Sequence, residues 1–221
     1  DLSGVLVPDT DGDGLAEIVE MTEGYTVDLR FGEIFDGFGN FGVVANIEEV
    51  DGSELADALF GDNLDNFLAG WGGNDVVYGY GGNDIVDGGE GDDQLRGDGP
   101  SSYNGPSGND QLFGGGGDDF MNGGAGVDTF DGGAGLDRVS FYNRAATQGA
   151  IANLFTQTIS NDGFGNAETM VSIEGLGAGT QFADQFTGDD NDNFVYAGRG
   201  DTVLTNGGND IIQVDSAALL L

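Results

Sequence analysis

Residues 79–96 read Gly79-Tyr-Gly-Gly-Asn-Asp84-Ile-Val-Asp-Gly88-Gly-Glu-Gly-Asp-Asp93-Gln-Leu-Arg96, which is one nine-residue unit written twice. Each unit is a glycine-rich hexad that ends in Asp, followed by three residues of which the second is apolar. Such alternation is typical of a short strand that turns one side chain inward. The glycines suit a tight loop because they adopt φ > 0 without a steric penalty. The unit therefore predicts a six-residue loop followed by a three-residue strand.

The same period runs through two blocks of the chain, and the Asp that closes each hexad supplies the carboxylate oxygens that Ca²⁺ prefers. We assign this sixth position to Asp65, Asp75, Asp84, Asp93, Asp110, Asp119, Asp128 and Asp137 in the first block, and to Asp192, Asp201 and Asp210 in the second. We assign the inward position to Val77, Val86, Leu95, Leu112, Met121, Phe130 and Val139, and to Phe194, Val203 and Ile212.

The period is interrupted twice in the first block. The spacing from Asp93 to Asp110 is eight residues longer than one unit, and the added stretch, 98–107, holds two of the three prolines. Proline cannot donate to a strand ladder, so we expect a loop that bulges from one edge, either a tolerated insertion or a functional loop. One further residue, Trp71 or its neighbour, is interpreted as an insertion before Asp75.

The repeated Gly-Gly-x-Gly-x-Asp-x-apolar-x unit resembles that of the RTX, or haemolysin-type calcium-binding, family. The resemblance implies an all-β parallel β-roll, a β-solenoid with two units in each turn. It also implies Ca²⁺ between loops of successive turns on one edge, so that Asp75 would pair with Asp93 and Asp119 with Asp137. The ligands would be the sixth-position carboxylates together with loop glycines, for which we name Gly82, Gly91, Gly108, Gly117, Gly126 and Gly135. The loop before Asp65 lacks the fourth-position Gly, and Arg199 occupies that position before Asp201, so these two loops depart from the family's pattern.

A separate calcium motif lies near the start of the chain. Asp9, Asp11, Asp13 and Glu20 match D-x-D-x-D-G-x₅-E, with Gly14 at the sharp turn. Pro8 and the β-like residues before it argue against a flanking helix. The loop therefore looks more like the Asp-rich loops of thrombospondin type 3 or FG-GAP-like repeats than a helical EF-hand.

A longer repeat relates the two blocks at an offset of 125 to 127 residues. Ile47-Glu48 recurs as Ile173-Glu174, and the pentapeptide Asp-Gly-Phe-Gly-Asn occurs at 36–40 and at 162–166. We expect the regions before each block to form wider, calcium-poor coils on the roll, or else a separate small β-module. The predicted units are an N-terminal Asp-rich loop (1–23), an irregular lead-in (24–56), a first block (57–141), a second lead-in (142–182), a second block (183–215) and an apolar end (216–221).

The composition restricts the partners of the protein. In 221 residues there are 44 Gly, 40 acidic and five basic residues, which gives a formal charge of −35. Such a charge repels itself in a compact state and disfavours nucleic acid and anionic membranes, so a divalent cation is the simplest neutraliser. Without calcium, a disordered low-complexity chain describes this composition better. No apolar run approaches the roughly 18 residues of a membrane span.

Catalysis is poorly supported by the residue types present. The chain has neither His nor Cys, which excludes an HExxH zinc site, a Ser-His-Asp triad, thiol chemistry and disulfides. We therefore expect no enzyme activity from these residues. Tyr78, Tyr80, Trp71 and Tyr103 are either a sugar-stacking platform or ordinary packing residues.

We expect a secreted calcium-binding β-roll with a structural or cell-surface role, such as a surface layer, fibre or matrix, and with self-association at its ends. The alternatives are a calcium-dependent folding and secretion module of a larger secreted enzyme (protease, lipase or epimerase) and an adhesin or glycan-binding module. The chain begins with Asp1, which is compatible with processing or with a fragment. The family resemblance implies type I secretion through an uncleaved C-terminal segment. The end, 217–221, fits such a segment or an apolar capping strand.

Overall fold

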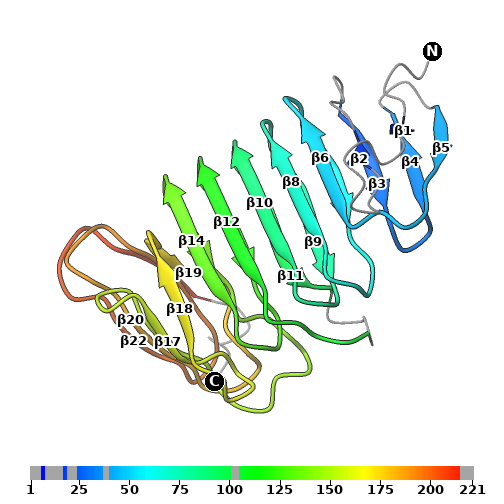
Figure 1. The fold of residues 1–221 in the computed structure, drawn as a ribbon. Coiled ribbons are helices and arrows are strands. Elements are labelled where there is room, and N and C mark those ends of the chain that lie inside the picture. The colour runs from blue at the N-terminus through cyan, green and yellow to red at the C-terminus, as the bar shows by residue number, and fades with distance from the viewer. Residues whose placement is uncertain (1–5, 8–16, 19–23, 37–39, 101–104, 215–221) are drawn as a thin grey trace.

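The computed structural model describes residues 6–7, 17–18, 24–36, 40–100 and 105–214, and every regular element in these ranges is a β-strand. Nearly all of these strands belong to two large sheets (Figure 1). The ten-stranded sheet has the spatial order β22 (Thr202–Leu204), β20 (Gln185–Thr187), β16 (Ile151–Asn153), β17 (Thr158–Asn161), β18 (Glu168–Val171), β14 (Thr129–Ala134), β12 (Gln111–Gly116), β10 (Ile85–Glu90), β8 (Phe67–Trp71), β6 (Glu49–Ser53). The eleven-stranded sheet has the order β23 (Ile211–Val214), β21 (Phe194–Ala197), β19 (Gly175–Leu176), β15 (Arg138–Val139), β13 (Phe120–Asn122), β11 (Gln94–Asp98), β9 (Val76–Tyr80), β7 (Ala58–Phe60), β3 (Thr26–Asp28), β4 (Glu33–Phe35), β5 (Phe41–Val43). A short antiparallel pair, β1 (Leu6–Val7) and β2 (Glu17–Ile18), precedes them.

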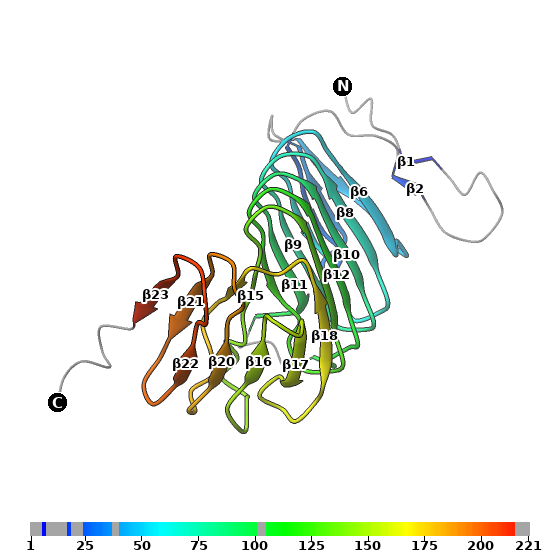
Figure 2. The same cartoon turned by 90° about the vertical axis from the view of Figure 1, so that its left-hand side faces the viewer.

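Successive nonapeptides contribute strands alternately to the two sheets, so two units complete one turn. Strands one turn apart pair in parallel and in register, as Val86 does with Leu68 on one side and Leu112 on the other. Figure 2 shows the resulting stack of coils, with β6, β8, β10 and β12 in one sheet and β9 and β11 in the other. The predicted parallel β-roll is confirmed.

The inward positions of the first block form the centre of the roll. A column of apolar side chains from successive turns is buried between the sheets because no single turn can cover its own apolar side. All seven predicted residues are in this core: Val77, Val86, Leu95, Leu112, Met121, Phe130 and Val139.

Two predictions of register were wrong. Phe67 pairs with Ile85 and Leu68 with Val86, so no residue is inserted near Trp71. In the second block Val195 is buried in place of Phe194. Both errors have one cause. The two loops contain the pairs Asp65-Asn66 and Asp192-Asn193, and in each pair the Asn takes the sixth position that we assigned to the Asp.

The two lead-ins are β-hairpins that join the sheets of the roll. Strands β3, β4 and β5 extend the eleven-stranded sheet antiparallel to one another, while β16 and β17 insert into the ten-stranded sheet beside β18. The second copy of the recurrent pentapeptide, 162–166, forms the turn between β17 and β18, since Asp162 Oδ1 accepts the N–H groups of Phe164, Gly165 and Asn166. The expected irregular coils are therefore ordered extensions of the same sheets. No helix in the described ranges is long and apolar enough to span a membrane.

Candidate calcium-binding edges

The glycine-rich loops lie along two edges of the roll. Loops that lead from the ten-stranded to the eleven-stranded sheet form what we call the first edge, and loops that return form the second edge. The sixth positions of the first edge are Asp57, Asp75, Asp93, Asp119 and Asp137. Those of the second edge are Asn66, Asp84, Asp110 and Asp128.

Each edge is tied from turn to turn by its sixth-position side chains. The backbone N–H of each residue donates to Oδ1 of the Asp one turn later, at 2.7 Å from Asp75 to Asp93 and at 2.9 Å from Asp119 to Asp137. Loops two repeats apart are thus neighbours on one edge, while calcium between them stays a prediction. The second edge repeats the pattern, with 2.9 Å from Asp84 to Asp110 and from Asp110 to Asp128.

The other oxygen of these carboxyls has no hydrogen-bond donor. Oδ2 is buried and unpartnered in Asp75, Asp84, Asp93, Asp110, Asp119, Asp128, Asp137 and Asp184. It lies against the first glycine of its own hexad, where a Cβ added to Gly88 would be 2.2 Å from Asp93 Oδ2. A buried carboxylate oxygen without a partner is costly, and a bound cation would satisfy it.

The turn-to-turn hydrogen bonds of the sixth-position residues form what we call a ladder along each edge. Burial raises the pKa of the carboxyls in these ladders. It raises the pKa of Asp75 to about 6, of Asp93 and Asp119 to about 7 and of Asp110 to about 8. The turn-to-turn N–H bonds oppose this rise in pKa, while the like charge of neighbouring carboxyls adds to it. The folded edges therefore favour protons or cations over free carboxylates.

The fourth-position glycines bring the backbones of successive loops into close contact. Gly82, Gly91, Gly117, Gly126 and Gly135 have φ between 111° and 156°, a range that side chains disfavour. A Cβ added to Gly91 would lie 1.7 Å from the carbonyl oxygen of Gly73, and one added to Gly108 would lie 1.6 Å from that of Gly82. Within the described residues no three acidic side chains converge on one point. A calcium ion on these edges would therefore need carbonyl oxygens in addition to carboxylates.

Asp65 and Asp192 do not take the sixth position predicted for them. Each is an exposed fifth-position residue that accepts the N–H of the fifth residue one turn later, from Asn83 and Asn209 respectively, at 2.6 Å. The sixth position belongs to Asn66 and Asn193, whose neutral amides bring no charge. These two loops thus have one carboxylate fewer facing the ladder than the prediction assumed.

The second block continues the ladders as predicted for Asp201 and Asp210. Oδ1 of Asp201 accepts the N–H of Asp184 at 2.9 Å, and Oδ1 of Asp210 accepts the N–H of Asn193 at 3.0 Å. The N–H of Gly198 donates to Oδ2 of Asp201 at 2.6 Å, so that oxygen already has a donor.

Four acidic residues of the ladders were missed. Asp57 lies 18 residues before Asp75, and Asp184 lies 17 before Asp201, so the spacing could have found both. Glu168 and Glu174 replace the sixth-position Asp one turn after Asp128 and Asp137, and the N–H of Asp137 donates to Glu174 Oε2 at 3.1 Å. No nine-residue spacing leads to these glutamates, because hairpin residues intervene.

Other predicted sites lie outside the described residues or are dispersed. Asp9, Asp11, Asp13 and Glu20 fall outside the described ranges, as do Tyr103 and residues 217–221. Tyr80 is only 5% exposed and lies beneath the Arg30 guanidinium, which is 3.9 Å from its ring centroid. Trp71 is exposed on the first edge, with Nε1 3.3 Å from Asp51 Oδ1. Tyr80 is thus covered by Arg30 and not available as an open stacking surface.

Comparison with known families agrees with this geometry. The model of the RTX calcium-binding nonapeptide repeat matches residues 51–99, 105–139 and 178–204, about half of the chain. No curated protein matches the chain. The matched segments contain the sixth-position residues of both edges in the first block, as well as Asp184 and Asp201.

Proposed function

This chain belongs to the RTX calcium-binding nonapeptide repeat family, and from that premise we propose that it is a secreted protein whose β-roll folds on meeting extracellular calcium. We propose further that the folded roll serves a structural or cell-surface role and is not an enzyme. Export by type I secretion is part of the same proposal. Calcium is the ligand that the repeats imply.

The observation that carries the proposal is the row of buried carboxyl oxygens without donors on both edges. In a chain with a formal charge of −35, bringing these groups together opposes folding unless a cation neutralises them. Extracellular modules typically bind Ca²⁺ with Kd about 10⁻⁴–10⁻³ M, which would leave the sites empty in cytosol and filled outside the cell. Folding would then be coupled to export.

A structural role agrees with the residue types of the chain. Without His or Cys it lacks the usual nucleophile–base pairs, and it has no disulfides. Calcium ions between successive turns would take over the cross-linking role of disulfides. At a free Ca²⁺ concentration of a hundred times Kd, each site would stabilise the fold by about 2.7 kcal/mol.

Calcium titration followed by far-UV circular dichroism tests the proposal. At pH 8, the chain in excess chelator should give the spectrum of a disordered polypeptide, and millimolar Ca²⁺ should produce a cooperative gain of β-structure. Mg²⁺ at equal ionic strength is the control, because it demands a tighter octahedral site and releases its water reluctantly. A β-spectrum that persists unchanged in excess chelator at pH 8 contradicts the proposal.

A further inference from the structure

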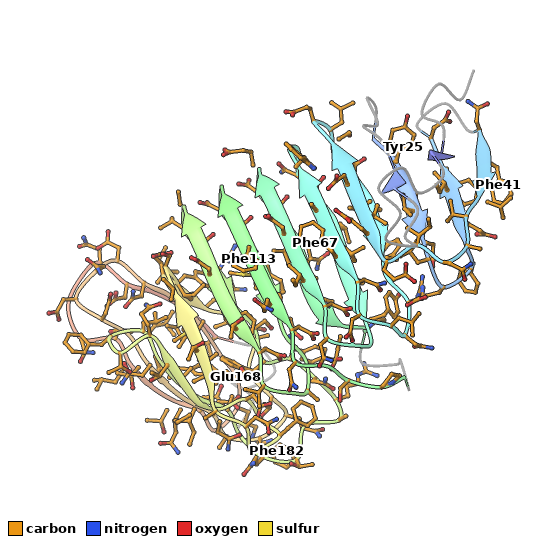
Figure 3. All side chains as sticks on the ribbon, in the orientation of Figure 1. Tyr25, Phe41, Phe67, Phe113, Glu168 and Phe182 are labelled. Atoms are coloured by element: carbon orange, nitrogen blue, oxygen red, sulfur yellow. The ribbon has the colours of Figure 1, made fainter. Side chains whose placement is uncertain are left out.

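The second-edge ladder continues beyond the nonapeptides into the second hairpin region. Thr169 and Met170 of β18 pair with Thr129 and Phe130 of β14, which sets Glu168 one turn after Asp128. The same register relates the sixth positions one turn apart elsewhere on this edge, such as Asp110 and Asp128. Figure 3 shows Glu168 at the start of β18. A glutamate from outside the repeats thus occupies a ladder position.

Asp128 and Glu168 form a buried pair of acids. Asp128 is 1% exposed and Glu168 is 6% exposed. Oδ2 of Asp128 and Oε1 of Glu168 both lack a hydrogen-bond donor. The salt bridge found within the described ranges, between Arg30 and Asp28, involves neither residue. Two adjacent buried carboxyls without a basic partner therefore require a proton or a cation between them.

A small cavity lies beside this pair. Its volume is about 10 Å³, close to the roughly 10–15 Å³ that one water molecule requires. Its lining includes Glu168, Asn122, Asp162 and the backbone of Gly123 and Gly124. A Cβ added to Gly123 would lie 2.1 Å from Asp128 Oδ2, so glycine keeps this space free of side chains. Ser140, Asn143, Phe130 and Phe141 complete the lining, so the cavity is bordered by polar groups and by two aromatic rings.

We propose that Asp128 and Glu168, together with neutral oxygens of this cavity, bind one Ca²⁺ ion at a site that is not formed between two nonapeptide loops. A divalent cation satisfies both unpartnered oxygens and neutralises both charges, whereas a single shared proton leaves one buried negative charge beside Asp162. The ion joins the last regular turn of the first block to the β17–β18 hairpin. This inference rests on the proposed function, because it takes Ca²⁺ as the ion.

Calcium stoichiometry of matched variants tests the site. Glu168→Gln keeps the size of the side chain and one of its two terminal oxygens, but removes the charge. The control is Glu90→Gln, which removes one charge from an exposed side chain on the first edge. Equilibrium dialysis in saturating Ca²⁺ should find one ion fewer bound per chain in Glu168→Gln and the wild-type number in Glu90→Gln.

A crystal structure of the calcium-loaded wild-type protein, with anomalous diffraction, keeps the inference testable if Glu168→Gln fails to fold. An anomalous peak between Asp128 and Glu168 supports the site, and its absence overturns it. An unchanged ion number in Glu168→Gln also overturns it. Failure of the wild-type protein to bind any calcium would instead refute the proposed function.

Discussion

The two carboxyl oxygens of a sixth-position Asp have different surroundings. Oδ1 accepts an N–H from the previous turn, while Oδ2 remains without a donor beside the first glycine of the loop. Asn66 shows that an amide can also fill the position: its Oδ1 lies beside the first glycine of its own loop, as Oδ2 does in the aspartates, and accepts the N–H of Asp62 in that loop at 2.8 Å. The negative charge is therefore the property that separates calcium binding from turn formation.

Asp119→Asn isolates that charge. The amide oxygen can still accept the Asp93 N–H, so we expect the turn to form but its calcium site to weaken. The calcium midpoint of folding should rise several-fold, and loss of one filled site would remove about 2.7 kcal/mol at a hundred times Kd. The control is Asp118→Asn, at an exposed fifth position whose Oδ1 accepts the Leu136 N–H at 2.9 Å. Equal midpoints for the two variants in a circular dichroism titration would refute the assignment.

Backbone contact between loops gives a second prediction at the residue scale. Gly117 has φ +123°, and an added Cβ would lie 2.2 Å from the carbonyl oxygen of Gly91. At Gly116 the added Cβ would meet only the Glu90 side chain, with its nearest oxygen at 2.9 Å. Gly117→Ala should therefore lower the free energy of unfolding by more than about 1 kcal/mol and Gly116→Ala by less. Urea denaturation in calcium measures both, and the reverse order would contradict the model of loop packing.

At the scale of elements, each ladder is a row of acids whose charge depends on pH. Folding raises the pKa of Asp75 to about 6, of Asp84, Asp93 and Asp119 to about 7, and of Asp110 to about 8, mainly through burial. Since the ordinary pKa of Asp is 3.8, the folded state binds more protons than the unfolded state between about pH 4 and pH 8. The ladders' contribution to stability without calcium is thus fully present below about pH 4 and is lost as the pH rises through 6 to 8.

In chelator, therefore, β-structure should be retained at pH 4 to 5 and lost by pH 8. In saturating Ca²⁺ the trend should reverse, because protons compete with the ion for the same oxygens. Thermal unfolding by circular dichroism across this range checks both branches. A calcium-free roll that grew more stable from pH 5 to pH 8 would show that these carboxyls are not protonated on folding.

The sequence determines some elements well and others poorly, for physical reasons. The apolar residue two places after each Asp predicted the buried column from Val77 to Val139, because period and burial coincide in a solenoid. Asn66 was missed because an amide can replace the carboxylate as a hydrogen-bond acceptor in the turn. Glu168 was missed because its place depends on pairing across the intervening β16–β17 hairpin, which spacing does not encode.

A deletion between Asp98 and Gly108 tests whether the extra residues are a tolerated insertion or a functional loop. Asp98 takes the second loop position, where its carboxylate accepts the N–H groups of Gly108 at 3.3 Å and Ala125 at 2.7 Å. Deleting residues 99–106 would leave Gly97-Asp-Ser-Gly-Asn-Asp110, a regular hexad. We expect unchanged β-structure and calcium stoichiometry, measured by circular dichroism and equilibrium dialysis. Loss of a calcium ion would show that the loop contributes to a site.

At the scale of the whole molecule, stacking gives the roll two different ends. At one end, β3 to β5 form an antiparallel extension of the eleven-stranded sheet. At the other, β23 is the last strand of that sheet in the described part of the chain. Its residues Ile211 and Val214 are 62% and 48% exposed. An exposed apolar edge strand is a template for pairing with another chain.

We therefore predict calcium-dependent self-association through β23. Sedimentation velocity in Ca²⁺ should show assemblies that grow with protein concentration, and chelator should dissolve them because it unfolds the roll. Ile211→Lys combined with Val214→Lys should keep the protein monomeric in calcium, since charged side chains protect an edge strand. Val127→Lys is the control, because Val127 is an exposed apolar fifth-position residue on the second edge, where loops and not strand edges face solvent. A wild-type protein that stays monomeric in calcium at every concentration, or that associates as strongly in the double variant, would exclude β23 as the contact and leave the roll with a role as an isolated calcium-binding unit.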